Sequence, residues 1–167
     1  MSTHPEFNTA DPLAYFLTWT TYGTWLTGDE RGWYRDGVPE VQEPNPVLEK
    51  MARSRMKEAE FILSDAQRRI VEATIRRHCE VRGWMLHAVN ARTNHVHVVV
   101  TAAGYRPETV RDQFKAWCTR RLKVVDPART RYWTEGGSCR WINLEADLEA
   151  AVLYTAEAQD RKGADYE

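Results

Sequence analysis

The segment 94–100, Asn-His-Val-His-Val-Val-Val, constrains the fold more than any other part of the chain. Side chains alternate between the two faces of a β-strand, so this segment places His95 and His97 on one face and three valines on the other. A run this apolar predicts a strand in the interior of a sheet. Two imidazoles on one rigid face offer a divalent metal two ligands, although the pair taken alone is more typical of one buried, hydrogen-bonded histidine beside an exposed one.

Composition indicates one globular domain. The chain has 167 residues, of which 43% are apolar and 28% charged, which suits a single hydrophobic core. A formal net charge of −1 does not by itself indicate a nucleic-acid-binding protein, so such binding would need a local basic surface. No apolar run approaches the length of a membrane span, and residues 1–13 lack a signal-peptide core. The lack of such a run leads us to expect no binding to membranes. Three widely spaced cysteines form no metal or disulfide pattern, so we expect a cytoplasmic protein.

The order of the predicted elements indicates the fold class. We expect strands at 15–22, 84–90, 95–101 and 138–142, and helices at 64–83, from 107 onward, and at about 144–159. A long loop separates the first strand from the first helix, and no repeat or second domain is visible. This order predicts an α+β protein with a ferredoxin-like split βαβ sandwich, in which an antiparallel sheet carries two helices on one face plus a C-terminal helix.

Capping residues and apolar stripes define the three predicted helices. Ser64 and Gln67 form a capping box, and Gly83 ends that helix. Pro107 opens the second helix, and Asn143 is expected to cap the third. The expected core-facing side chains are Val71, Ile75 and Cys79 in the first helix, Val110, Phe114, Trp117 and Leu122 in the second, and Leu148, Ala151 and Val152 in the third.

Two segments could contact a nucleic acid. In the loop at about 23–63, Arg31 and Trp33 could bind it by charge and stacking, although a surface loop pinned by one aromatic side chain is an equal alternative. The second helix carries a basic surface, which is usually a solvated face, but most of its basic residues have no acidic partner at i±4, so phosphate contacts are a plausible alternative. Its basic side chains are Arg111, Lys115, Arg120, Arg121 and Lys123, of which the first four are the expected phosphate contacts.

Four features occur together in this chain. They are the strand at 94–99, the helical segment Phe-Lys-Ala-Trp-Cys-Thr-Arg-Arg-Leu at 114–122, the segment Tyr-Trp-Thr-Glu-Gly-Gly-Ser at 132–138, and Tyr154 in the last helix. The combination resembles the HUH-type single-tyrosine transposases of the smallest bacterial insertion sequences, and most closely the REP-associated tyrosine transposases. The resemblance covers roughly residues 14–160 and implies a single HUH endonuclease-like domain spanning 1–167.

The resemblance implies an activity and its residues. In this family a His-hydrophobic-His motif binds a divalent metal and a helix tyrosine attacks single-stranded DNA, so His95 and His97 are expected to hold Mg²⁺ or Mn²⁺ and Tyr154 to be the nucleophile. A phosphotyrosine intermediate conserves the bond energy for rejoining, so strand transfer needs no ATP. The expected partner is single-stranded or hairpin DNA, bound by a monomer or a homodimer. Without the resemblance, Tyr154 would be read as a helix tyrosine that packs one edge on the core.

The third metal ligand departs from the family pattern. The family usually has Gln or Asn four residues after the tyrosine, and this chain has Ala158 there. On a regular helix Glu157 lies about 60° from Tyr154 and Gln159 about 140° away. Geometry therefore favours Glu157, whereas the ligand type favours Gln159.

The resemblance implies two alternative functions. The first is an enzyme that cleaves single-stranded DNA and transfers the strand, in DNA transposition or in the processing of REP-type hairpins. The second is a non-cleaving protein that binds hairpin DNA or RNA, derived from a transposase. A phosphoesterase with two His-x-Ser/Thr motifs is excluded, because no such motif occurs in the chain.

Overall fold

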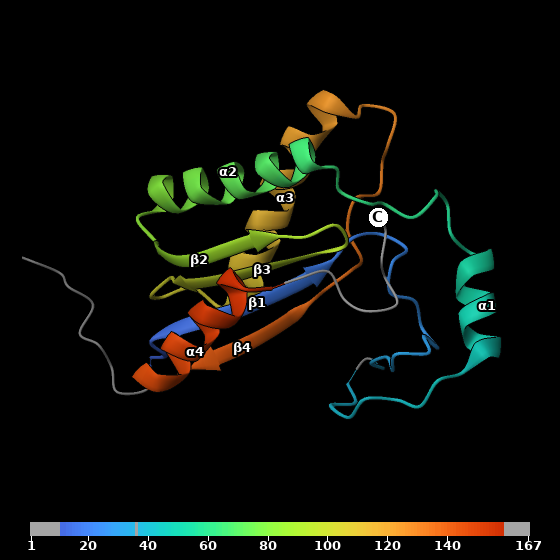
Figure 1. Ribbon diagram of the computed structural model, residues 1–167, viewed down its shortest axis with the longest axis horizontal. Coiled ribbons are helices and arrows are strands. Elements are labelled where there is room, and N and C mark those ends of the chain that lie inside the picture. Colours follow the sequence, from blue (N-terminus) through green and yellow to red (C-terminus); the bar gives the residue numbers. More distant parts are fainter. Residues whose placement is uncertain (1–10, 36, 159–167) are drawn as a thin grey trace, which may run out of the picture.

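The computed structural model describes residues 11–35 and 37–158, which form an α+β domain (Figure 1). Within these residues the elements are, in chain order, β1 (Ala14–Thr20), α1 (Pro46–Ser54), α2 (Asp65–Arg82), β2 (Met85–Ala91), β3 (His95–Thr101), α3 (Pro107–Val125), β4 (Ser138–Ile142) and α4 (Glu145–Ala156). None of the described helices is long and apolar enough to cross a membrane.

The four strands form one antiparallel sheet in the order β2-β3-β1-β4. This confirms the predicted antiparallel α+β architecture, and the order is compatible with a ferredoxin-like sandwich. The apolar strand β3 lies inside the sheet between β2 and β1, as its sequence predicts. The short strand β4 forms one edge and pairs only with β1 among the described strands.

The two faces of the sheet are covered by different helices (Figure 1). The larger core lies between the sheet and the pair α2 and α3, and it contains Val96, Val98 and Val100 of β3. A smaller core lies under α4, where Ala14, Val99 and Ile142 are buried. Because side chains alternate along β3, the histidines lie on the same face as Val99, beneath α4.

The ends of α2 follow the sequence signals. The Ser64 hydroxyl accepts from the Gln67 backbone, and the Gln67 side chain accepts from the Ser64 backbone, which completes the capping box. Gly83 ends the helix with φ of 71°, a left-handed conformation that costs glycine little. The expected stripe of Val71, Ile75 and Cys79 is buried.

Two details of the later helices differ from expectation. In α3, the expected core residue Trp117 is 38% exposed, and Cys118 is buried in its place. The core-facing side chains follow one another at intervals of four residues, from Val110 to Phe114 to Cys118. The N-cap of α4 is Leu144, which makes no side-chain capping bond, so the predicted cap at Asn143 is wrong.

The long loop contains a helix that the sequence analysis did not predict. The helix α1 is capped by Asn45, whose side chain accepts from the Leu48 backbone, and it begins at Pro46. It has only nine residues and buries none of them, so no packing against the core marks it as a helix. In Figure 1 it lies away from the sheet, at the far end of the loop.

Candidate active site on the α4 face of the sheet

The two histidines of β3 are both buried, with 1% of His95 and 2% of His97 exposed. Their ring centroids lie 4.6 Å apart. The strand geometry therefore brings both imidazoles together on one face, as the period-two pattern predicts. The alternative of one buried and one exposed histidine is wrong.

Each imidazole is oriented through its Nδ1 atom. The Nδ1 atom of His95 lies 2.7 Å from Oδ1 of Asn94, and that of His97 lies 2.8 Å from the hydroxyl of Thr18. Because Oδ1 can only accept, this contact places a proton on Nδ1 of His95. A neutral imidazole held through one nitrogen presents the other as a metal ligand, so the chemistry of these donors fits a divalent cation.

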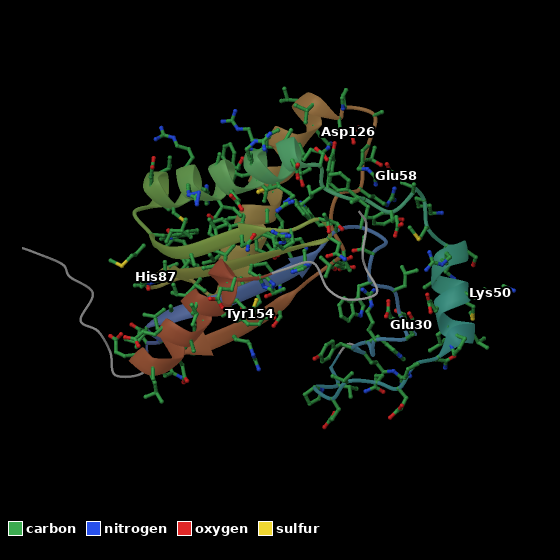
Figure 2. The ribbon with its side chains drawn as sticks, in the orientation of Figure 1. Glu30, Lys50, Glu58, His87, Asp126 and Tyr154 are labelled. Carbon is green, nitrogen blue, oxygen red and sulfur yellow. The ribbon has the colours of Figure 1, made fainter. Side chains whose placement is uncertain are left out.

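Tyr154 lies on α4 (Figure 2), and its ring contacts that of His97. Its ring centroid is 5.6 Å from that of His97, and the two rings meet edge to face at 77°. Phe16 of β1 contacts both, with its centroid 5.9 Å from Tyr154 and 5.7 Å from His97. Tyr154 is 57% exposed, so its phenol is open to solvent while its ring contacts a buried histidine of the same chain.

The position of α4 is set by packing and by one side-chain amide. Leu148, Ala151 and Val152 pack against the smaller core, as predicted. The side-chain amide of Asn90 on β2 donates to the backbone carbonyls of Thr155 and Ala158, at 2.9 and 3.2 Å. These bonds hold the end of the helix that carries Tyr154 against the sheet.

A third metal ligand is not evident in the described part of the chain. Within residues 11–35 and 37–158, no three His, Cys, Asp or Glu side chains gather closely enough to hold a metal. Glu157 is exposed at the C-cap of α4, and Ala158 is buried. Gln159 lies outside the described residues.

Two of the predicted phosphate-binding residues are engaged inside the protein. Arg111 donates to the carbonyl of Gly137 and forms an ion pair with Asp112, and its side chain is 12% exposed. Lys115 donates to the carbonyls at 134 and 136, both at 2.8 Å. Burial and the neighbouring Arg111 lower the pKa of Lys115 to about 8. Both side chains therefore anchor the segment 134–137 to α3.

The other two predicted phosphate-binding residues of α3 are at the surface. Arg120 and Arg121 are exposed, and the guanidinium of Arg120 lies 4.6 Å from the centroid of the Trp117 ring. An exposed arginine over an exposed indole is a suitable surface for phosphates and bases. It belongs to the helix layer on the opposite face of the sheet from Tyr154.

The loop residues predicted to contact nucleic acid have internal partners. Arg31 is paired with Asp29 and donates to the carbonyl of Thr24. Trp33 is 6% exposed, and its indole N–H donates to the carbonyl of Glu43. The alternative of a loop pinned by an aromatic side chain is therefore what the structure shows for Trp33.

Three side chains that shape the site carry no signal in the sequence. Asn90 of β2 and Thr18 of β1 pair with His97 from its two sides. Phe16 lies two residues before Thr18 on β1, on the same face of the sheet. No local pattern marks them, because each acts through strand pairing. Only a correct prediction of the sheet order and register would have found them.

Comparison with known proteins adds no relative to this picture. No protein-family model matches the chain, and no curated protein sequence matches it.

Proposed function

We propose that this protein cleaves single-stranded DNA with Tyr154 as nucleophile and transfers the strand, in the manner of an HUH-type single-tyrosine transposase. The observation that carries the proposal is the edge-to-face contact between Tyr154 and His97, 5.6 Å between ring centroids, beside the second buried histidine. Two histidines of β3 thus lie beside a tyrosine of α4, which supports the assignment of a metal-binding pair and a nucleophile. The strand order supports the ferredoxin-like split βαβ fold of the proposal.

The chemistry assigned to Tyr154 is a phosphoryl transfer. The phenol oxygen loses its proton and attacks a backbone phosphorus, so a phosphotyrosine bond forms as the phosphodiester bond breaks. The departing sugar oxygen takes up a proton. When the DNA hydroxyl later attacks the phosphotyrosine, the reverse exchange rejoins a strand and restores the phenol. The exposed side chain is accessible to a DNA strand, and its ring contact with His97 supports a defined orientation of the nucleophile.

Mg²⁺ or Mn²⁺ is the cofactor of the proposal, held by His95 and His97 with Glu157 or Gln159 as candidate third ligand. When bound, the cation supplies Lewis-acid stabilisation of the charge on the phosphate. The protein's own part is to orient the imidazoles: Asn94 and Thr18 hold the Nδ1 atoms. Because Tyr154 contacts a histidine of its own chain, a monomer suffices to assemble these groups.

A second function is a non-cleaving protein that binds hairpin DNA or RNA. One observation favours it: the residue four positions after Tyr154, where the family has its third ligand, is the buried Ala158. Loss of that ligand would weaken cleavage while leaving the fold and the basic surface of α3 unchanged.

A denaturing gel distinguishes the two functions. Wild-type protein is incubated with Mn²⁺ and a labelled pool of random-sequence single-stranded and hairpin DNA. We expect a covalent protein–DNA band from the wild type and none from Tyr154→Phe, which retains the ring packing. The matched control is Tyr34→Phe, since Tyr34 is 67% exposed in the loop, and it should give the wild-type band. A band that persists in Tyr154→Phe would place the nucleophile elsewhere, and no wild-type band from any DNA would favour the non-cleaving protein.

A further inference from the structure

Arg140 lies on the same face of the sheet as the histidines and Tyr154. Residues that pair directly across antiparallel strands share a face, and Arg140 of β4 pairs with Phe16 of β1. The ring of Phe16 contacts both Tyr154 and His97. Adjacent strands are about 4.8 Å apart, so the backbone of Arg140 is one strand spacing from the residue on which Tyr154 packs.

The Arg140 side chain is available to a ligand. It is exposed, and within the described residues no hydrogen bond, ion pair or ring contact involves it. This differs from Arg111 and Lys115, whose donors are used to hold the segment 134–137. The edge strand β4 has no further strand beside it among the described residues, so a nucleic-acid chain can approach Arg140 from the side.

We infer that Arg140 binds the DNA phosphate that lies at Tyr154. The inference rests on the proposed function, and it deepens it by naming the residue that receives the anionic strand. A guanidinium donates two parallel N–H groups to phosphate oxygens, and its charge favours the additional negative charge that develops when the phenol attacks. An extended arginine side chain spans more than one strand spacing, which is the separation that it has to cross.

The first test measures binding without cleavage. Two proteins are compared in the presence of Mn²⁺: the Tyr154→Phe variant and the double variant that also carries Arg140→Gln. Their affinities for a fluorescent 30-nucleotide single strand are measured at several KCl concentrations. One phosphate contact on single-stranded DNA contributes about 0.7 to the slope of log K against log salt, so the slope should fall by about 0.7. The matched control is Arg55→Gln, an exposed arginine at the C-cap of α1, which lies away from the sheet (Figure 1), and it should leave the slope unchanged. An unchanged slope in Arg140→Gln would overturn the inference.

The second test measures attack on the phosphate. With a DNA strand that the wild type captures, the rate of adduct formation should fall at least about tenfold in Arg140→Gln and recover partly in Arg140→Lys. A methylphosphonate at the scissile position removes the negative charge of that phosphate, so it should narrow the difference between wild type and Arg140→Gln. Equal rates for wild type and Arg140→Gln would overturn the inference while leaving the proposed function intact. Absence of any wild-type adduct would instead contradict the proposed function. The salt slope of the first test would then decide by itself whether Arg140 binds a DNA phosphate.

Discussion

The side-chain amide of Asn90 donates a 2.9 Å hydrogen bond to the carbonyl of Thr155, across 65 residues of sequence. Asn90 also pairs in register with His97, so one residue of β2 adjoins the metal-ligand candidate and the helix of the nucleophile. The same amide reaches the carbonyl of Ala158 at 3.2 Å. Asn90 therefore connects the position of Tyr154 to the strand that holds the histidines.

Removing this amide should loosen the end of α4. We expect Asn90→Ala to lower the free energy of unfolding by about 1–2 kcal/mol, because two carbonyls lose their donor. Adduct formation should slow more than DNA binding weakens, since the helix that orients Tyr154 is affected. Urea unfolding and the denaturing gel measure the two effects. Asn143→Ala is the control and should change neither, because Asn143 does not cap α4; equal behaviour of the two variants would contradict the role of Asn90.

Replacing both histidines of β3 should abolish binding of Mn²⁺. His95→Leu and His97→Leu are preferred to alanine because both rings are buried and alanine would leave cavities, and to glutamine because its amide oxygen can itself bind a metal. Electron paramagnetic resonance of free Mn²⁺ measures the affinity, and circular dichroism checks the fold. The control is His78→Leu, since His78 is buried against aromatic rings of the larger core and contacts Gln113. A double variant that binds Mn²⁺ as tightly as the wild type would refute the metal assignment.

The buried ammonium of Lys115 should make stability depend on alkaline pH. Its pKa falls from 10.5 to about 8 in the folded protein, so between these values the unfolded chain binds more protons than the folded one. Stability due to this group therefore rises as the pH increases from about 8 to 10.5, and below pH 8 the full cost of burying the charge is present. Measured by urea unfolding, the free energy of unfolding of the wild type should increase relative to that of Lys115→Met as the pH is raised from 7.5 to 9.5. The difference between wild type and Lys123→Met, a variant on the exposed surface of the same helix, should not change over this range.

The exposed arginines of α3 should contribute to DNA affinity, unlike the buried anchors. We expect the double variant Arg120→Gln and Arg121→Gln to reduce the salt slope for single-stranded DNA by about 1.4, or 0.7 for each phosphate contact. The fold should be unchanged because both side chains are exposed. Fluorescence anisotropy at several KCl concentrations measures the slope. A slope equal to that of the wild type would show that α3 does not face the DNA.

The sequence alone determined the parts of the structure that depend on near neighbours. Alternation along 95–101 placed both histidines on one face, and the capping box at Ser64 with Gly83 bounded α2. These signals act over at most four residues, so a linear pattern contains them. The local reading was wrong at Asn143 and missed α1, a short helix without a buried stripe.

Tertiary structure decided which side chains meet. Thr18 lies 79 residues from His97 in the chain and orients its imidazole, and Phe16 and Arg140 adjoin through the pairing of β1 with β4. It also assigned Lys115 to holding a loop rather than facing solvent. The physical reason is register: a shift of one residue between strands turns every side chain to the opposite face, and no pattern within a strand specifies its neighbour.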